Sequence, residues 1–405
     1  MTTTHDQHDL QTRMSLDHCV KCTICETHCP VMAVTPKFPG PKFVGPQAER
    51  YRHGESVDQS LDYCSSCGTC TLVCPQGVKI AEINSQARAV MKKNHMPLRD
   101  RIISRTTLLG KVMTPIAPIA NWKLSLRPVR WFIEKLFGIH RHAPMPRANS
   151  RTFSSWWKKH TPPTPTRGKV VFFHGCAGEF FEVDTSIKTV EVLEFLGYEV
   201  VTPKQGCCGL ALQSNGLFDA ARRHVNKLAQ QLNIEPGTPI IASAASCAGM
   251  LKHEAREILG VNDPKLAEVG TRVRDVCEFL LSLAESGDLP LDFQPINETV
   301  AYHGPCQLKS QGMGLPALDV LRLIPGLTVI DSEATCCGIA GTYGLKKEKY
   351  AIAQAVGQPL FDKVITVNPH LALCDTETCR WQIAASTGAE VQHPIWMIHQ
   401  AYGLS

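Results

Sequence analysis

The spacing of its cysteines constrains this chain more than any other feature of the sequence. The chain has 18 cysteines in 405 residues. Eight of them form two tight groups of identical spacing, each ending in Cys-Pro: Cys19, Cys22, Cys25 and Cys29-Pro30, then Cys64, Cys67, Cys70 and Cys74-Pro75. Residues 101–168 contain no cysteine, and the other ten are spread over residues 169–405. The cysteines therefore divide the chain into three parts before any secondary structure is considered.

The two tight groups have the spacing of bacterial ferredoxins, which hold two [4Fe–4S] clusters. Three cysteines with two residues between neighbours wrap one face of a cubane cluster, and the fourth, turned away before proline, reaches the other cluster. We therefore predict a first and a second ferredoxin quartet, namely Cys19, Cys22, Cys25 and Cys74, and Cys64, Cys67, Cys70 and Cys29. Zinc is the alternative, but an all-cysteine zinc site takes two C-x2-C pairs rather than four cysteines within 11 residues.

Composition limits the class of protein and the compartment. The chain is 43% hydrophobic and 20% charged, which suits a globular protein and excludes a collagen, a wholly disordered chain or a polytopic membrane protein. The formal charge of +5 is too small to predict nucleic-acid binding. Residues Met1 to Leu10 are polar and carry no signal-peptide core. We therefore expect a cytosolic chain, in which disulfides are rare and clustered cysteines more often bind metal.

Residues 169–405 contain the same pattern twice. In the first copy the apolar run Val170–Phe173 leads to Cys176, and in the second Thr299–Tyr302 leads to Cys306. A Cys-Cys-Gly motif follows after 31 and 30 residues, and a last cysteine follows each motif. The agreement in order and spacing indicates a duplicated unit. The cysteines of the two copies are Cys176, Cys207, Cys208 and Cys247, and Cys306, Cys336, Cys337 and Cys379.

Within each copy, apolar strands alternate with helical patterns. In the first copy we predict strands at Val170–Phe173, Glu199–Thr202 and Pro239–Ala242, with helices at Thr185–Leu196 and Gly216–Leu232; in the second, strands near Val300, Val329 and Leu371. This alternation predicts a parallel α/β sheet in each copy. Every cysteine group follows a predicted strand, and the carboxyl ends of parallel strands share the edge where ligands bind. The four cysteines of each copy are therefore candidate metal ligands, for iron–sulfur or zinc.

The cysteine-free part combines helical patterns with basic and aromatic residues. Over Val129–His142 apolar residues recur at helical spacing, with Trp131 and Phe137 among them. Such a helix either lies on an anionic membrane or a partner, or packs on its own protein, and the pattern within 113–142 leaves both open. Residues 143–167 contain five prolines and predict a linker over the surface.

The expected fold is multidomain. A mostly helical two-cluster domain (1–100) precedes a connector (101–168) and two repeated α/β cysteine-rich domains (169–295 and 296–405). Outside the quartets, we expect Cys277 to be a core thiol and Cys374 to be either a core thiol or an additional sulfur for the second copy. We expect His174, His303 and His393 to neighbour the metal sites or to be satisfied in the core. No Ser/His/Asp triad or paired carboxylates can be recognised, so no residue is assigned to catalysis.

The repeated Cys-Cys-Gly pattern resembles the paired cysteine-rich (CCG) domains of heterodisulfide reductase B subunits and of the iron–sulfur subunits of glycolate and lactate oxidation complexes. With two ferredoxin-type clusters in front, the chain is most similar to the C-subunit family of anaerobic glycerol-3-phosphate dehydrogenases. The local strings that carry this likeness are Cys19-Val-Lys-Cys22-Thr, Phe38-Pro-Gly-Pro-Lys42, Phe172-Phe-His-Gly-Cys176, Cys336-Cys-Gly-Ile-Ala-Gly-Thr-Tyr-Gly344 and Glu377-Thr-Cys-Arg-Trp-Gln382.

The resemblance implies an electron-transfer and membrane-attachment subunit on the cytoplasmic side of the cell membrane. It would take electrons from a flavoprotein pair that oxidises sn-glycerol 3-phosphate and pass them to menaquinone. A glycolate- or lactate-oxidising partner and a thiol–disulfide enzyme of the heterodisulfide reductase type are the alternatives, and a zinc-stabilised scaffold is a third. In heterodisulfide reductase each unit ends in C-x-x-C, but here Ala244 and Thr376 stand three residues before the last cysteines. This departure argues against the disulfide enzyme.

Overall fold

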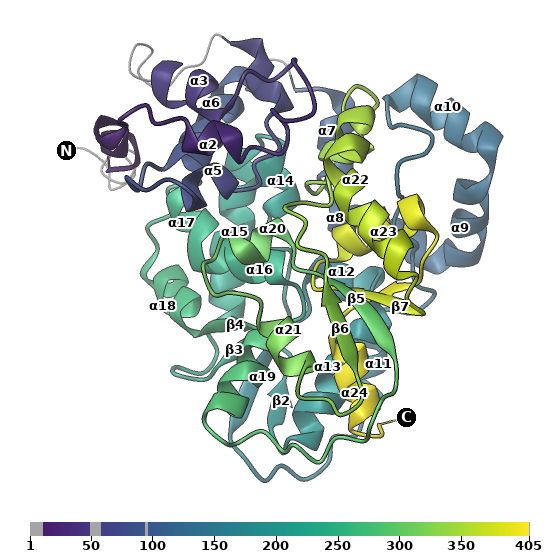
Figure 1. The fold of residues 1–405 in the computed structure, drawn as a ribbon. Helices are drawn as coiled ribbons and strands as arrows, with labels where there is room; N and C mark the ends of the chain where they lie inside the picture. Colours follow the sequence, from purple (N-terminus) through teal and green to yellow (C-terminus); the bar gives the residue numbers. More distant parts are fainter. Residues whose placement is uncertain (1–10, 49–57, 94–95, 405) are drawn as a thin grey trace.

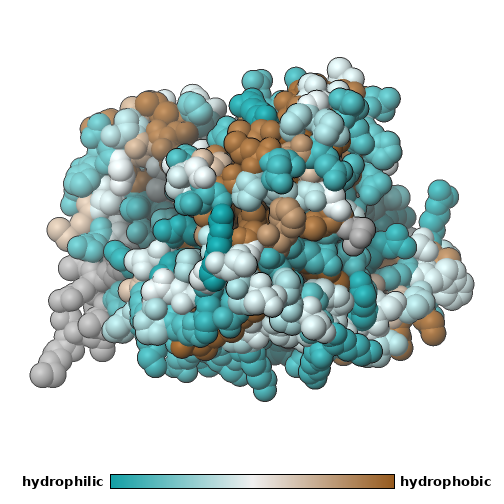
Figure 2. All heavy atoms as spheres, turned by 90° about the horizontal axis from the view of Figure 1, so that it is seen from below, coloured by the Kyte–Doolittle hydropathy of each residue, from teal (hydrophilic) through white to brown (hydrophobic). Residues whose placement is uncertain are grey.

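The computed structural model describes residues 11–48, 58–93 and 96–404, so the expectation for Met1 to Leu10 lies outside the described residues. Figure 1 shows the N-terminal helices at the upper left, the connector helices α9 (Ala117–Ser125) and α10 (Arg127–Phe137) at the upper right, and two sheets below them. In the view from below, hydrophobic residues gather in separate patches, the largest near the centre, within a mostly hydrophilic surface (Figure 2).

The N-terminal part is helical, and its described residues form no strand. Short helices surround both groups of cysteines, and one longer helix, α6, packs against them. The elements are η1 (Ser15–His18), α2 (Ile24–Thr27), α3 (Pro41–Val44), η2 (Gln59–Tyr63), α5 (Thr69–Leu72) and α6 (Ile80–Lys92). The structure therefore confirms a mostly helical N-terminal region.

The C-terminal part contains two four-stranded parallel sheets of the same strand order, β2-β1-β3-β4 and β6-β5-β7-β8. Their strands are β1 (Lys169–Phe173), β2 (Glu199–Val201), β3 (Ile240–Ala242), β4 (Val273–Asp275), β5 (Thr299–His303), β6 (Thr328–Asp331), β7 (Leu371–Cys374) and β8 (Val391–Gln392). The predicted duplication and the parallel α/β class are confirmed. The sequence did not predict β4 and β8, because each contains a single apolar residue and so no apolar run marks it as a strand.

Helices cover both sheets and join them. In the first copy these are α12 (Gly175–Phe180), α13 (Val183–Phe195), α14 (Leu210–Ser214), α15 (Phe218–Leu232), α16 (Ala245–Gly249), the π-helical η4 (Met250–Glu254), α17 (Ala255–Glu257), α18 (Pro264–Arg272) and α19 (Val276–Glu285). The second copy has α20 (Cys306–Lys309), α21 (Pro316–Leu321), η5 (Tyr343–Leu345), α22 (Tyr350–Val367), α23 (Glu377–Thr387) and α24 (Ile395–Ala401). Helix α13 packs on α24, and α19 packs on α21. Because these are equivalent contacts in the repeat, the two copies face each other with approximate two-fold symmetry around one shared core.

The connector is helical through most of its length. It comprises α7 (Leu98–Ile103), α8 (Thr106–Met113), η3 (Thr114–Ile116), α9, α10 and α11 (Phe153–Trp157). The proline-rich segment differs from the expected surface linker, because α11 interrupts it and buries Phe153 in the core of the first copy. Aromatic packing of Phe153 against Phe172 and His174 therefore ties the connector to β1.

Helix α10 turns its polar residues inward and its apolar residues outward. The buried Arg130 guanidinium donates to the carbonyl oxygens of Arg141 and His140, at 2.9 and 3.3 Å. The Glu134 carboxylate, also buried, pairs with Arg141. Trp131, Phe132 and Leu136 are exposed, the last two at 59% and 60%. Part of the apolar face of α10 is therefore open to solvent, whereas Val129, Ile133 and Phe137 are half-buried. Among the described residues, no helix is both long and apolar enough to cross a membrane.

Candidate iron–sulfur centres

The two ferredoxin quartets are built from one repeated turn. Cys19 and Cys64 each end a 3-10 helix, η1 and η2. Two and four residues later, both loops take left-handed backbone conformations, at Lys21 and Thr23 in the first and Ser66 and Gly68 in the second. The repeated conformation turns each loop around its cysteines. In the second loop the Ser66 amide donates to Cys64 Sγ at 3.4 Å, and elsewhere the Val78 amide donates to Cys74 Sγ at 3.4 Å.

The fourth cysteine of each run lies beside the other run. Burial raises the pKa of Cys25 to about 11, and the negative charges of Glu26, Cys74 and Cys19 add to the rise. Burial likewise raises the pKa of Cys29 to about 12, with smaller contributions from Cys67 and Cys64. Cys74 is thus an electrostatic neighbour of the first group, and Cys29 of the second. This crossed arrangement is what two clusters with exchanged fourth ligands require.

In the first copy, four cysteines from three loops converge where strands β1, β2 and β3 end. We call them the first Cys-Cys-Gly site: Cys176, Cys207, Cys208 and Cys247. Cys176 Sγ lies 3.5 Å from Cys207 Sγ, and Cys208 Sγ lies 3.5 Å from Cys247 Sγ. The Gly209 amide donates to Cys207 Sγ at 3.4 Å. Convergence at the sheet edge is as the sequence predicts, while ligation of a metal by these thiols stays a prediction.

The second copy repeats this geometry after β5, β6 and β7. We call it the second Cys-Cys-Gly site: Cys306, Cys336, Cys337 and Cys379. The Cys336 and Cys306 sulfurs are 3.9 Å apart, and those of Cys337 and Cys379 are 3.0 Å apart. The Gly338 amide donates to Cys336 Sγ at 3.3 Å. Glycine is needed here, because the backbone has φ +85° and an added Cβ would lie 1.9 Å from the carbonyl oxygen of Ala353.

Both sites fit a thiolate-bound cluster. Each gathers four thiols, none in a disulfide, with a backbone amide aimed at sulfur. The pKa of Cys208 is raised well above its usual value by hydrogen bonding with Cys207 and Cys247 and by burial. The same causes, with Cys337 and Cys374 as partners, raise the pKa of Cys379. Such thiols ionise only beside strong positive charge, which bound iron or zinc supplies.

The second ferredoxin quartet adjoins the second Cys-Cys-Gly site. Burial raises the pKa of Cys67, and the negative charge of Cys336 is the next contribution. The pKa of Cys306 is raised in turn, first by its hydrogen bond with Cys336, then by burial, and also by the negative charge of Cys67. Cys29, Cys64 and Cys336 also share one apolar cluster, against which Cys306 packs. The thiols of these two sites therefore form a continuous group across the domain boundary.

The first Cys-Cys-Gly site meets the connector instead. The Thr106 hydroxyl, at the start of α8, lies 3.1 Å from Cys176 Sγ and 3.7 Å from Cys207 Sγ. Sequence analysis missed Thr106, because it stands 70 residues from Cys176 in no recognisable motif. Only the packing of α8 on α12 brings the two residues together.

The remaining candidates divide between the sites and the core. His303 lies beside Cys337 and Cys379, with ligand atoms within 4.8 Å of one another, and burial lowers its pKa to about 3. His174 Nδ1 donates to the carbonyl oxygen of Gly175, next to Cys176, and burial lowers the pKa of His174 to about 4. Cys374 is fully buried and hydrogen-bonds with Cys379. It is therefore both a core thiol and a fifth sulfur at the second site.

Two other candidates lie away from the thiols. Cys277 packs in the shared core, as expected. His393 is fully buried; its Nδ1 accepts from the Ile395 amide, and its charged neighbour is Arg380 rather than a cysteine. Within the described part of the chain, neither residue hydrogen-bonds with a sulfur of the four sites. Both are therefore left out of the candidate centres.

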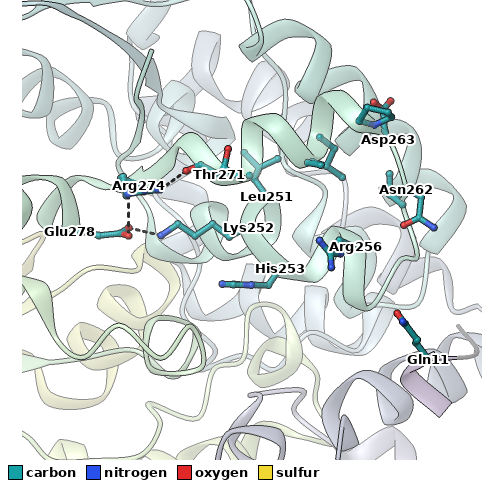
Figure 3. Close-up of a pocket in the computed structure, with 15 residues that line it drawn as sticks. Gln11, Leu251, Lys252, His253, Arg256, Asn262, Asp263, Thr271, Arg274 and Glu278 are labelled. Carbon is teal, nitrogen blue, oxygen red and sulfur yellow. Dashed lines mark hydrogen bonds and ion pairs between the residues drawn. The ribbon is translucent and has the colours of Figure 1, made fainter. Parts of the chain in front are cut away.

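A wide surface groove beside η4 and α18 is not part of the metal centres. Figure 3 shows its basic side chains, with Lys252 and Arg274 both directed at the Glu278 carboxylate. His253 and Arg256 also line it, and no cysteine does. The lining holds the cations Lys252, Arg256 and Arg274 and the carboxylates Asp263 and Glu278, so the groove offers little net charge to an anion.

Comparison with known proteins agrees with this architecture. A 4Fe-4S dicluster domain matches residues 15–78, and a cysteine-rich domain matches residues 170–252 and 300–384. The chain is 29% identical over 226 residues to the B subunit of the CoM/CoB fumarate reductase of Methanothermobacter marburgensis, covering 55% of this chain and 43% of that protein. It is 28% identical to the glycolate oxidase iron-sulfur subunit of Escherichia coli K12, with 95% and 93% covered.

A higher identity spans nearly the whole of both proteins. The chain is 40% identical over 400 residues to the C subunit of the anaerobic glycerol-3-phosphate dehydrogenase of Escherichia coli K12, covering 96% of this chain and 98% of that protein. The order of the matched domains, one dicluster domain and two cysteine-rich domains, is the order seen in the structure. On this evidence, the chain belongs to the C-subunit family of anaerobic glycerol-3-phosphate dehydrogenases, whose matched domains are iron–sulfur domains.

Proposed function

We propose that this chain is the iron–sulfur electron-transfer subunit of an anaerobic sn-glycerol-3-phosphate dehydrogenase. It takes electrons from a flavoprotein pair and passes them to menaquinone. The two ferredoxin quartets each hold a [4Fe–4S] cluster, and the two Cys-Cys-Gly sites hold further clusters. Thiolate-bound iron changes its charge by one electron at a time, so such centres can connect a flavin to a quinone. We also propose that the chain divides into four parts, with the bounds 1–100, 101–168, 169–295 and 296–405.

The observation that carries the proposal is the contact between the second ferredoxin quartet and the second Cys-Cys-Gly site. Cys67 and Cys336 are electrostatic neighbours although they belong to different domains. At the other end of the relay, Cys22 of the first quartet is exposed. We therefore place the donor at the first quartet. The order is first quartet, second quartet, second Cys-Cys-Gly site and first Cys-Cys-Gly site.

Substrate-driven reduction tests this function. The anaerobically purified chain is mixed with the flavoprotein subunits, and cluster reduction is followed by low-temperature EPR after addition of sn-glycerol 3-phosphate, glycolate or lactate. Reduction by glycerol 3-phosphate alone is the expected result. Reduction only by glycolate or lactate would replace the donor, a candidate favoured by the 28% identity to the glycolate oxidase subunit. No reduction by any of the three would refute the electron-transfer role.

We also propose that the connector attaches the chain peripherally to the cytoplasmic face of the membrane. Residues 101–168 hold thirteen Lys and Arg but a single acidic residue, Glu134. Trp122, Phe132 and Leu136 stand exposed on α9 and α10, at 59–61%. Apolar side chains beside basic ones match an anionic lipid surface, where hydrocarbon inserts and cations meet headgroups.

Vesicle binding tests the attachment. Trp131, Phe132 and Leu136 are replaced together by Ser, and sedimentation with phosphatidylglycerol vesicles is compared with that of the unaltered chain. Burial of one apolar side chain in the membrane contributes about 1.5–3 kcal/mol to the binding free energy, so the triple variant should bind at least tenfold more weakly. Ile234→Ser and Leu291→Ser, at exposed apolar sites outside the connector, are the control and should bind normally. Equal binding of the triple variant would reject this surface as the attachment.

A further inference from the structure

A cavity lies where the ferredoxin region, the connector and the two cysteine-rich copies meet. Cysteines of both Cys-Cys-Gly sites line one side of it. The connector and the start of the first copy line another side with apolar side chains, namely Ile103, Leu109, Met113, Ile139, Met145 and Phe181. The cysteines on the first side would hold the clusters. The apolar side chains on the other side contact no cluster ligand in this scheme, so the clusters alone do not explain why they line the cavity.

Helix α8 lies between this cavity and solvent, with apolar side chains on both of its faces. Leu109 and Met113 line the cavity, whereas Leu108 and Val112 are exposed, at 52% and 60%. At the start of the same helix, the Thr106 hydroxyl contacts Cys176 Sγ. An α-helix is about 10 Å across with its side chains. The thickness of one helix therefore separates the first Cys-Cys-Gly site from the exposed face of α8 that carries Leu108 and Val112.

Polar side chains also line the cavity, away from the apolar wall. The Glu254 carboxylate accepts a hydrogen bond from Gln213 Nε2 at 2.6 Å and lies within reach of Gln307. A concave site that combines an apolar wall with polar groups suits a ligand with a hydrocarbon body and polar substituents. Among the described residues, Arg88 is the one cation that lines the cavity, and its guanidinium already donates to the Cys64 carbonyl oxygen and to Ser66 Oγ, both at 2.7 Å.

We propose that this cavity binds the ring of a quinone between the Leu109–Met113 face of α8 and the first Cys-Cys-Gly site. The inference rests on the proposed electron-transfer function and adds the place where the acceptor is reduced. The ring takes two electrons, one at a time, from the reduced iron–sulfur relay. Its two carbonyl oxygens take two protons from water, which the Glu254 carboxyl can relay, and become the hydroxyls of a quinol. The isoprenoid tail leaves along the exposed face of the connector.

Filling the cavity tests this site. The cluster-loaded chain is reduced with dithionite and mixed with vesicles that contain menaquinone-4, and re-oxidation is followed by absorbance. Leu109→Trp should slow re-oxidation at least tenfold, because the indole occupies the ring's place. Leu291→Trp makes the same change at an exposed leucine outside the connector and should stay within twofold. Equal rates for Leu109→Trp and the unaltered chain, with iron content unchanged, would overturn the site.

Photolabelling of the unaltered chain gives a second readout that does not depend on how the variants fold. An azido-naphthoquinone is activated on the cluster-loaded protein, and the modified peptides are identified by mass spectrometry. Label on residues 103–113 or 139–146 is expected. Label confined to the ferredoxin region would overturn the site but leave the electron-transfer function standing. If menaquinone-4 does not re-oxidise even the unaltered chain, the proposed acceptor fails, and this inference fails with it.

Discussion

The two Cys-Cys-Gly sites have the same backbone frame but different neighbours. Each places its cysteines after the first three strands of a copy, in sheets of identical order. The first site meets Thr106 of the connector, whereas the second meets Cys67 of the ferredoxin region. The second also has His303 and a fifth thiol, Cys374, close to its sulfurs. Ala242 ends the corresponding strand of the first copy, where no thiol is available.

The comparison shows that the duplication supplied two four-thiol sites with different neighbours. In the proposed relay the second site receives electrons, because it adjoins the ferredoxin quartet. The first site delivers them, because α8 alone lies between the cavity beside it and the exposed Leu108 and Val112. This difference is located in residues outside the repeat itself. It can therefore be tested by changing one site at a time.

The largest expected effect follows from removing one thiol from each site. Cys336→Ser should lose the second site's cluster, about four irons if it is a cubane, and should prevent reduction of the first site by donors. Cys207→Ser should lose a similar amount of iron but leave the second site reducible. Iron analysis and EPR of the two variants measure both effects. If Cys336→Ser still passed electrons to the first site, the proposed order would be wrong.

A smaller effect, on stability, is expected where Lys346 of the second copy contacts two other parts of the chain. The buried Lys346 ammonium donates to Asp100 Oδ2 of helix α7 and to Asn215 Oδ1 of the first copy, both at 2.8 Å. Lys92 and Arg99 still pair with Asp100, so Lys346→Ala removes two buried hydrogen bonds rather than the last cation and should lower the free energy of unfolding by about 1–3 kcal/mol. Denaturant unfolding measures the change. Lys347→Ala, an exposed neighbour, should change it by less than about 0.5 kcal/mol.

The smallest effect concerns a single hydrogen bond at the first site. A hydroxyl that donates to sulfur stabilises the reduced, more negative centre, so Thr106→Val should lower the midpoint potential of that site. One hydrogen bond of about 1 kcal/mol corresponds to roughly 40 mV for one electron. Thr106→Ser should restore the value, and the second site should not change. A redox titration followed by EPR separates the two sites. A shift at both sites would show a general structural effect instead.

Local patterns in the sequence predicted much of this structure. Strands β1, β2 and β3 and helices α13 and α15 lie within a few residues of their predicted ranges, because apolar periodicity and glycine mark them. The convergence of each set of Cys-Cys-Gly cysteines followed from one rule, that strand ends share an edge. These features depend on neighbours along the chain.

Contacts between distant segments could not be predicted in this way. The helical pattern of α10 indicated an amphipathic helix but not that Arg130 and Glu134 face inward, because their partners belong to a loop of no recognisable pattern. No sequence pattern distinguishes Thr106 from other threonines, because it reaches the first site only through the packing of α8 on α12. The pairing of the second ferredoxin quartet with the second copy, rather than the first, likewise depends on how whole domains pack.

Metal analysis with an EPR-monitored redox titration, on protein purified without air, tests the central claim most directly. Two cubanes alone supply roughly eight irons. A relay through both Cys-Cys-Gly sites predicts clearly more iron than that, with separate signals that disappear one by one in Cys207→Ser and Cys336→Ser. Eight irons with zinc or no metal at the Cys-Cys-Gly sites would contradict it.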